Sequence, residues 1–254
     1  MAAWSPTAPA ARHGVAGPSV HTMELSGART LVAGATGVLG SGLARALHAR
    51  GARVALAGRS AERLAALGAD LEAPTFTFDA LDLDRCAAVV GEAADALGGL
   101  DVLVVAIGVA AFGPGDGEDD AVTEHLLTVN TMAPMALVRA ALPRFDDSGS
   151  LAVLSAILAD YPTAGMAAYT ASKAALSAWL TALRPEQRRR GVAVFDVRPP
   201  HIETGLAERA IAGSAPPMKA GTTVDEVVEL IVDGIRTGRR ELRYDLMKGE
   251  FAGR

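Results

Sequence analysis

The stretch from Arg29 to Gly51 reads RTLVAGATGVLGSGLARALHARG, and the rest of the chain repeats its pattern. Its apolar beginning is typical of a short buried strand, and the part from Val38 onward has the apolar spacing of a helix. Three glycines, Gly34, Gly37 and Gly40, lie where the strand ends and the helix begins. A glycine-rich turn at the first strand–helix junction favours a site for the phosphates of a dinucleotide.

Short apolar runs and longer helical segments alternate along the remaining sequence. Strands are expected at residues 53–57, 75–78, 101–107, 151–155, 192–197 and 241–244, and helices at 60–67, 82–97, 121–142, 167–189 and 224–237. Such alternation predicts an α/β fold: a doubly wound parallel sheet of the Rossmann type, as a single domain with helices on both faces. Pro134 is expected to kink the helix that contains it.

Length and composition place nearly the whole chain in that one domain. Half of the 254 residues are apolar, which suits an α/β domain of ordinary size. Residues 1–22 are rich in Ala, Pro, Gly and Ser, and they lack a charged start followed by an apolar core. They predict a flexible N-terminal leader and not a secretory signal, so a single dinucleotide-binding domain is expected over 23–254.

Charge and cysteine content argue against several classes of protein. The net charge of −5 indicates neither a nucleic-acid surface nor a surface for anionic membranes. No apolar run reaches the ~18–20 residues of a membrane span. The single cysteine, Cys86, cannot form an internal disulfide and indicates a reducing, cytoplasmic compartment. No His, Cys or carboxylate cluster in the sequence has metal-ligand spacing, so no metal is expected.

The glycine turn offers a role for each of its glycines. The first permits a tight turn, the second lets a pyrophosphate approach backbone N–H groups, and the third lets the helix pack closely on the strand. The turn residues expected to contact the cofactor are Gly34, Thr36, Gly37, Val38, Leu39 and Gly40.

The end of the second strand indicates which dinucleotide binds. An acidic residue there binds the ribose 2′-OH of NAD, whereas an arginine accommodates the 2′-phosphate of NADP. This chain has Arg59 and Ser60 at that point and no acid. A cation beside a hydroxyl favours NADP, and NAD is the weaker alternative. The simpler alternative is that Arg59 is a surface residue with no role in cofactor binding.

Tyr169 and Lys173 are the candidate chemical groups. Their spacing of four places both side chains on one face of the predicted helix at 167–189, about one turn apart. A neighbouring ammonium favours the phenolate and so is expected to lower the pKa of the phenol. The pair is therefore a plausible acid/base device for an alcohol or a ketone.

Together these features resemble the short-chain dehydrogenase/reductase family, over nearly the whole chain after residue 22. The pair Tyr169 and Lys173 matches the catalytic pair of that family, and Asn130 matches its structural asparagine. The sequence Pro199 to Thr204 is similar to the loop that binds the nicotinamide carboxamide. Further cofactor contacts implied by the resemblance are Asp79, Ala80, Ala106, Gly108, Lys173, Ile202 and Thr204.

The resemblance implies an NADP-dependent oxidoreductase that interconverts a small ketone or aldehyde and an alcohol by hydride transfer. Tyr169 would be the general acid/base, and Lys173 would lower the pKa of Tyr169 and bind the cofactor ribose. Asn130 would hold a water in a proton relay, and a serine would polarise the substrate oxygen. The resemblance also implies a homodimer or homotetramer that assembles through the long helices.

The sequence departs from the family pattern at three places. Val105 to Gly108 replaces the usual Asn-Asn-Ala-Gly, and Pro200 replaces the glycine of the nicotinamide loop. The family's serine precedes the tyrosine by 13 positions, where this chain has Ala156, while Ser155 lies 14 positions before it. Either the intervening loop is one residue longer and Ser155 is catalytic, or the serine is lost; we favour Ser155.

A second class of function stays open from the sequence. The replaced asparagines and the shifted serine are compatible with a dinucleotide-binding regulatory or scaffold protein that has weak or no turnover. For the enzyme, residues 205–221 have the Gly, Ala and Pro content of a movable segment that could close an apolar pocket. The substrate and the direction of the reaction cannot be read from the sequence.

Overall fold

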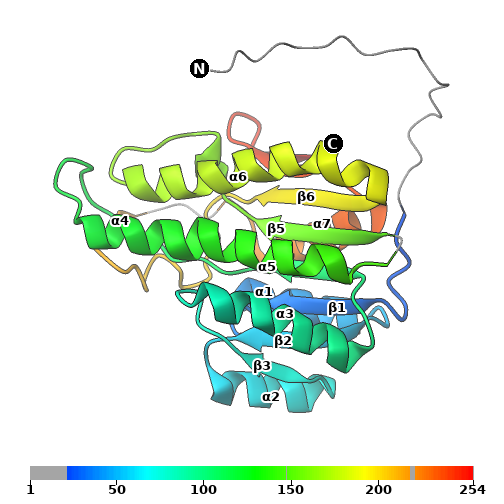
Figure 1. Cartoon of the computed structure of the whole chain (residues 1–254). Helices are drawn as coiled ribbons and strands as arrows, with labels where there is room; N and C mark the ends of the chain where they lie inside the picture. The colour runs from blue at the N-terminus through cyan, green and yellow to red at the C-terminus, as the bar shows by residue number, and fades with distance from the viewer. Residues whose placement is uncertain (1–21, 147, 218–220, 254) are drawn as a thin grey trace, which may run out of the picture.

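The structure is a computed structural model that describes residues 22–146, 148–217 and 221–253. Its centre is an eight-stranded sheet in the order β3-β2-β1-β4-β5-β6-β7-β8 (Figure 1). The strands are β1 (Arg29–Ala33), β2 (Arg53–Gly58), β3 (Thr75–Thr77), β4 (Val102–Val105), β5 (Gly149–Leu154), β6 (Val192–Arg198), β7 (Glu241–Asp245) and β8 (Glu250–Gly253).

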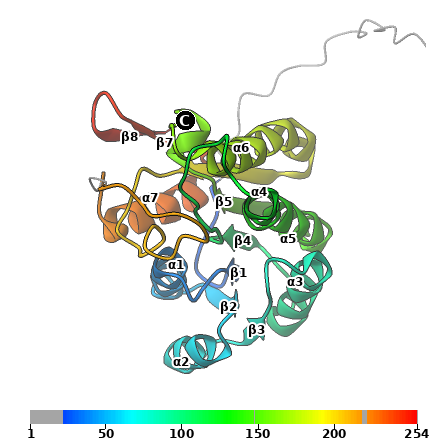
Figure 2. The same cartoon turned by 90° about the vertical axis from the view of Figure 1, so that its left-hand side faces the viewer.

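Helices cover both faces of the sheet, as Figure 2 shows in a view along the strands. One layer holds α3, α4, α5 and α6, and the other holds α1, α2 and α7. The helices are α1 (Val38–His48), α2 (Ala61–Leu71), α3 (Leu83–Leu97), α4 (Asp120–Leu127), α5 (Ala133–Ala141), α6 (Ala167–Gln187) and α7 (Val224–Thr237). Single 3₁₀ turns occur at Leu142–Arg144, Ile157–Ala159 and Arg188–Arg190. The predicted doubly wound α/β fold with helices on both faces is therefore confirmed.

The predicted parallel sheet holds for seven strands, with one exception at its edge. Strands β1 to β7 pair with one another in parallel, and β4 lies near the middle of the order. The sequence predicted one last strand at 241–244, but β8 returns antiparallel to it and was missed. Tyr244 packs edge-on against Phe251, with ring centroids 5.2 Å apart, which ties this hairpin together.

Two apolar cores lie on opposite faces of the sheet. Alternation along each strand sends one set of side chains toward α3, α5 and α6 and the other set toward α1 and α7. On β5, Leu151 and Val153 face the first core, and Ala152 and Leu154 face the second. Because these strands are parallel, their carboxyl ends all lie at the same end of the sheet, between the two helical layers.

The irregularity expected at Pro134 takes the form of a π-helical turn. The predicted helix 121–142 is divided into α4, the π turn Thr128–Met132 and α5. Pro134 has no N–H and cannot donate to the carbonyl of Asn130, so the ladder changes to the wider spacing, as in the bond from Ala133 N to Thr128 O. The wider turn directs Asn130 into the protein, where it is fully buried.

The continuous helical run Asp120–Arg144 is long and apolar enough, by composition, to cross a membrane. More than half of its most apolar part is buried inside the protein, however, and α5 packs against α3. It therefore has the properties of a core helix.

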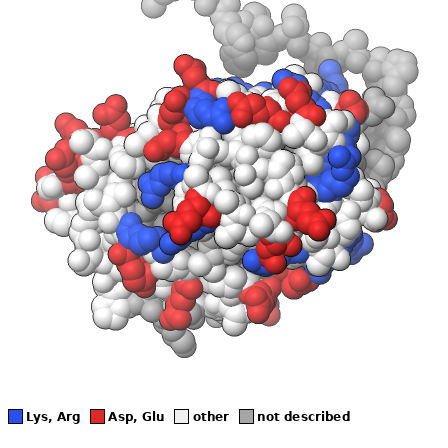
Figure 3. Space-filling model, turned by 90° about the horizontal axis from the view of Figure 1, so that it is seen from below, with Lys and Arg blue, Asp and Glu red and all other residues white. Residues whose placement is uncertain are grey.

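The molecular face in Figure 3 carries acidic and basic side chains interspersed with each other.

Candidate active site

The glycine turn between β1 and α1 is held by two close backbone contacts. Gly34 has a positive φ of 91°, and a Cβ atom at this residue would lie 2.5 Å from the Ala106 carbonyl oxygen. A Cβ atom at Gly40 would lie 2.1 Å from the Gly34 carbonyl oxygen. Both positions therefore require glycine, because a side chain would overlap with backbone that cannot move away.

Gly37 differs from its two neighbours, because nothing in the protein excludes a side chain there. Its nearest neighbour would be the Gly34 carbonyl oxygen at 3.4 Å, an ordinary contact. Gly37 is the N-cap of α1, no side chain caps the helix, and its first turn contains no acid. The Gly37 N–H donates to the Gly34 carbonyl at 3.0 Å, but the N–H groups of the first helical turn have no side-chain cap and can bind an anion. The donors and the bare backbone fit the pyrophosphate of a dinucleotide.

The residues expected to read the adenosine end follow β2 and β3. Arg59 is exposed at the end of β2, and Ser60 caps α2 by accepting from the Arg63 N–H at 3.3 Å. The Asp79 carboxylate accepts from the Leu81 N–H at 3.0 Å, and Ala80 is half-buried beside it. These four residues lie at the same edge of the sheet as the glycine turn but outside the pocket described next.

One pocket joins the glycine turn to Tyr169 and Lys173. It has a volume of about 220 Å³, which suits a nicotinamide ring and a small substrate better than a whole dinucleotide. The expected site residues that line it are Gly37, Val38, Leu39, Gly40, Ala106, Gly108, Ser155, Tyr169, Lys173, Ile202 and Thr204. Gly34, Thr36 and Asn130 are not among the residues that line it.

The opposite wall of the pocket is apolar. Its residues come from the segment after β4, the segment after β5 and the segment after β6: Ala110, Phe112, Ala156, Ile157, Leu158, Met166, Leu206 and Ala207. The third segment is attached to the first by backbone hydrogen bonds from Ile211 N to Ala110 O at 2.8 Å and from Phe112 N to Ala212 O at 2.9 Å. The wall would accommodate an apolar substrate. Residues 218–220 of the expected movable segment lie outside the described residues.

Tyr169 and Lys173 are both buried on the inner face of α6, at 7% and 3% exposure. The Lys173 ammonium donates to the Leu154 carbonyl at 3.2 Å. Burial lowers the pKa of Lys173 to about 8, although the negative charge of Asp196 acts in the opposite direction. Burial raises the pKa of Tyr169 to about 12. Desolvation of the buried phenolate is therefore the dominant effect on the Tyr169 pKa, and the lowering expected from Lys173 stays a prediction.

Asn130 connects the helical layer to the floor of the pocket. Its side chain accepts from the Val109 N–H at 2.9 Å and donates to the Val109 carbonyl at 3.0 Å. Its amide also donates to the Ser172 hydroxyl at 3.1 Å, which in turn donates to the Tyr169 carbonyl at 2.7 Å. A Cβ atom at Gly108 would lie 3.3 Å from both Asn130 Oδ1 and Lys173 Nζ, so this glycine keeps the floor open.

The geometry of Ser155 does not favour the catalytic role expected of it. Its side chain continues the face of β5 that packs under α6, and its hydroxyl donates to the buried Asp196 carboxylate at 2.5 Å. Ala156, by contrast, packs in the same apolar cluster as Tyr169. Both residues line the pocket, but the Ser155 hydroxyl is bound to Asp196 and Ala156 is the one that packs with Tyr169.

Sequence reasoning missed two groups of polar residues at this site. Ser172 links Asn130 to the backbone of Tyr169, and Asp196 accepts from both Ser155 and Ser177. An acid in the middle of the apolar run VAVFDVR was a usable signal, because buried carboxylates require partners. Nothing in the local pattern around Ser172 separates it from an ordinary helical serine.

Comparisons with known proteins agree with this geometry. A sequence profile described as short chain dehydrogenase matches residues 28–214. The chain is 32% identical over 194 residues to the dehydrogenase/reductase SDR family member 7B of Bos taurus, covering 71% of this chain and 60% of that protein. It is 32% identical over 232 residues to an uncharacterized oxidoreductase of Myxococcus xanthus, covering 87% and 88%. The chain thus spans less than two thirds of the bovine protein.

Solved structures of the same kind have the same fold. A dehydrogenase/reductase from Sinorhizobium meliloti superposes with a TM-score of 0.76 at 26% identity, over 86% of this chain and 92% of the other. A short chain dehydrogenase from Burkholderia cenocepacia in complex with NADP superposes with a TM-score of 0.74 at 30% identity, over 84% and 92%.

Proposed function

This chain belongs to the short-chain dehydrogenase family, and we propose that it is an NADP-dependent reductase of an apolar ketone or aldehyde. The observation that carries the proposal is the shared pocket. The free helix end at Gly37, the Tyr169–Lys173 pair and an apolar wall line one cavity. The anion site, the proton donor and the substrate wall are therefore within reach of one bound dinucleotide and one small substrate.

The cofactor supplies hydride to the carbonyl carbon when it is bound. Gly37 to Gly40 would bind its pyrophosphate, and Ile202 and Thr204 would lie against its nicotinamide end. Tyr169 would donate its proton to the substrate oxygen as the negative charge develops there. Lys173 would bind the ribose and stabilise the phenolate that remains. Asn130 would hold a water in the relay that returns the proton through Lys173.

The protonation state of Tyr169 suits its proposed role as proton donor in reduction. With a pKa of about 12, the phenol keeps its proton at neutral pH and is ready to donate. The reverse reaction would use the phenolate, which Lys173 would stabilise. The proposal is tested by NADPH oxidation with a panel of apolar ketones and aldehydes. It is rejected if the protein binds NADPH but turns over no carbonyl.

The choice of NADP over NAD rests on Arg59. Replacing Arg59 by Asp should weaken NADPH binding by roughly 10- to 100-fold, because a charge-assisted hydrogen bond to the 2′-phosphate is lost and a repulsive acid is added. NADH binding should change much less. Dissociation constants measured by cofactor fluorescence check this.

Arg53 offers a matched control, since it is also exposed and lies at the opposite end of β2. Arg53→Asp should leave the NADPH dissociation constant unchanged. Equal NADPH affinity in wild type and Arg59→Asp would show that Arg59 does not recognise the 2′-phosphate. The complex of the Burkholderia relative with NADP is compatible with the preference proposed for this chain.

Ala156 suggests a gain-of-function experiment. A serine there would place a hydroxyl in the apolar cluster around Tyr169, beside the site expected for the substrate oxygen. Ala156→Ser should raise kcat/KM for a reduced carbonyl by roughly 10-fold or more, because a donor to the developing oxyanion is added. Steady-state kinetics measure the effect. Ala159→Ser, which adds the same group outside the pocket, should have no effect; an unchanged Ala156→Ser would contradict the proposed substrate position.

The same alanine favours one alternative function, a dinucleotide-binding protein with weak or no turnover. The family's serine is replaced, and the hydroxyl of Ser155 is engaged with Asp196. NADPH binding without carbonyl reduction in wild type, combined with reduction in Ala156→Ser, would favour this alternative. Assembly as a homodimer or homotetramer through α4, α5 and α6, and a cytoplasmic location, remain proposals from family membership and from the single cysteine.

A further inference from the structure

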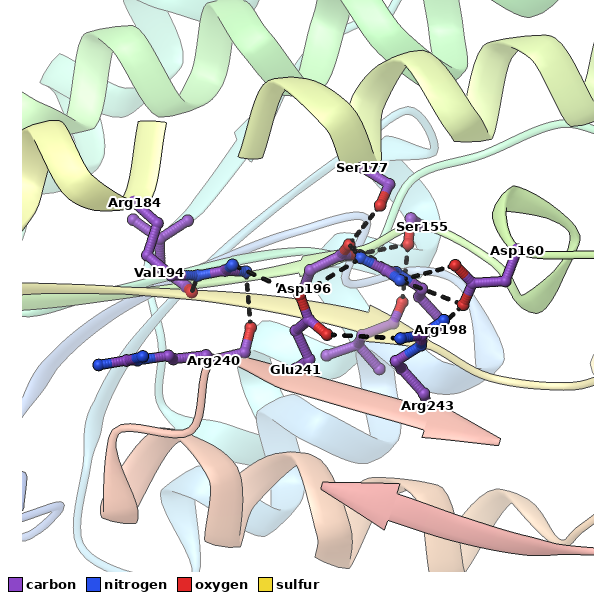
Figure 4. A network of polar contacts seen from close by, with 11 residues as sticks. Ser155, Asp160, Ser177, Arg184, Val194, Asp196, Arg198, Arg240, Glu241 and Arg243 are labelled. Carbon is purple, nitrogen blue, oxygen red and sulfur yellow. Dashed lines mark hydrogen bonds and ion pairs between the residues drawn. The ribbon is translucent and has the colours of Figure 1, made fainter. Parts of the chain in front are cut away.

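A buried carboxylate, that of Asp196, lies close enough to Lys173 to act on its charge. Asp196, on β6, has no exposed surface, and its carboxylate accepts from Ser155 at 2.5 Å, from Ser177 at 2.7 Å and from Arg198 Nε at 2.8 Å. Figure 4 shows these groups converging from β5, α6 and β6. A buried carboxylate without partners would be strongly destabilising, so this arrangement is a built polar centre.

Two of these hydrogen bonds act on the supports of Lys173. Ser177 follows Lys173 by four residues on the same face of α6, so its bond to Asp196 fixes the helix turn that carries the lysine. Ser155 directly follows Leu154, whose carbonyl accepts from the Lys173 ammonium at 3.2 Å. One carboxylate therefore anchors both the helix that presents the ammonium and the strand end that receives it.

The charges around Lys173 make Asp196 its electrostatic partner. Tyr169 on α6, and His201 and Arg209 from the segment after β6, line the same pocket, and none of them carries a negative charge at neutral pH. Asp196 and Arg198 face the site from β6, and Asp160 meets Arg198 from the segment after β5. Among the described residues, Asp196 supplies the negative charge that favours the ammonium form of Lys173.

The outer part of the centre is held by balanced ion pairs. Arg198 binds Asp196 on one side and Asp160 on the other, at 2.8 Å in each case. Asp160 also pairs with Arg243 of β7 at 2.9 Å, and Glu241 lies 3.7 Å from Arg198. Acidic and basic groups therefore compensate one another, and Arg198 is held by Glu241 of β7 as well as by Asp196 (Figure 4).

We propose that Asp196 is a positioning residue that keeps Lys173 in place and in its charged form beneath the pocket. The proposal rests on the proposed function, in which Lys173 binds the ribose and stabilises the phenolate. Asp196 contacts neither substrate nor cofactor; it acts through Lys173. At neutral pH a buried lysine is close to losing its proton, so a fixed negative charge nearby determines how much of the protein carries the ammonium.

The chain permits a direct measurement, because it has only three lysines: Lys173, Lys219 and Lys248. In ligand-free protein labelled with ¹³C at the lysine ε-carbon, three signals are expected, and Lys173→Arg identifies the one of interest. That signal should titrate near pH 8 in wild type. In Asp196→Asn it should titrate roughly one pH unit lower. The matched control Asp160→Asn removes the outer carboxylate only and should change the titration much less.

A second variant should shift the Lys173 titration in the opposite direction. Arg198→Gln removes the cation that compensates Asp196, so Lys173 should titrate at higher pH than in wild type. An unchanged titration in folded Asp196→Asn would overturn the proposal. If Asp196→Asn does not fold, an unchanged titration in Arg198→Gln would overturn it instead.

The titration needs no turnover, so it separates this proposal from the proposed function. If wild type reduces no carbonyl but the Lys173 signal shifts as described, the function fails and the positioning role stands. If wild type is active, the alkaline limb of its kcat profile should move to lower pH in Asp196→Asn by the same amount as the NMR titration. A merely structural role for Asp196 would lower activity at every pH without that shift.

Discussion

Tyr169→Phe is expected to lower kcat for carbonyl reduction by roughly 10²- to 10⁴-fold, the usual contribution of a positioned general acid. The change removes only the hydroxyl, because the ring packs in an apolar cluster with Leu126 and Ala156 that phenylalanine can also fill. Folding and NADPH binding should therefore be retained. Single-turnover NADPH oxidation, together with the NADPH dissociation constant, measures the two effects separately.

The chain offers a matched control for this variant among its three tyrosines. Tyr161 is 42% exposed and lies outside the pocket, so Tyr161→Phe should keep wild-type kinetics. Retention of more than a tenth of the wild-type kcat by Tyr169→Phe would mean that another group or a water donates the proton. Loss of NADPH binding together with kcat would instead indicate that the ring no longer packs as in wild type.

Gly40→Ala is expected to destabilise the protein by roughly 1–3 kcal/mol or more, the range seen when atoms are forced into a packed interior. The new methyl group would lie 2.1 Å from the Gly34 carbonyl oxygen and 2.7 Å from its carbon, so the turn between β1 and α1 would have to shift. Urea unfolding measures the loss of stability. A variant as stable as wild type would contradict the close packing of α1 on the turn.

Gly37→Ala is the informative partner of that variant. Its methyl group finds an ordinary contact of 3.4 Å in the protein, so the free energy of unfolding should change by no more than ~0.5 kcal/mol. NADPH binding should nevertheless weaken by roughly 10-fold or more, because the methyl group covers the N–H groups that the pyrophosphate needs. Unchanged NADPH affinity would place the pyrophosphate elsewhere.

Features that repeat within one element could be predicted well. The apolar periods of β1 and α1, the glycines between them and the four-residue spacing of Tyr169 and Lys173 depend on backbone geometry over a few residues. The helix starts expected at residues 60 and 82 are equally local, because Ser60 and Asp82 accept from N–H groups three residues later. The fold class follows from such local units once they alternate.

Features that depend on distant partners were missed or wrong. Whether Ser155 meets the substrate or Asp196 depends on the register of β5 against β6, which joins residues 41 positions apart. The pKa of Tyr169 depends on how much of the chain covers it, and the sequence suggested only the charge of Lys173. The residues of the β7–β8 hairpin show too little apolar alternation for the sequence to predict the second strand, β8.

The sequence by itself thus determined a doubly wound α/β domain, a glycine turn able to hold a dinucleotide, and a tyrosine and a lysine on one helical face. Only the tertiary structure decided the surroundings of that pair. It turned Asn130 inward through a π turn, packed Ala156 in one cluster with Tyr169, and bound the buried Asp196 to Ser177 on the helix that carries Lys173. The reason is physical: local periodicity follows from bonds within one element, whereas burial, charge and hydrogen-bond partners arise only where several elements pack together.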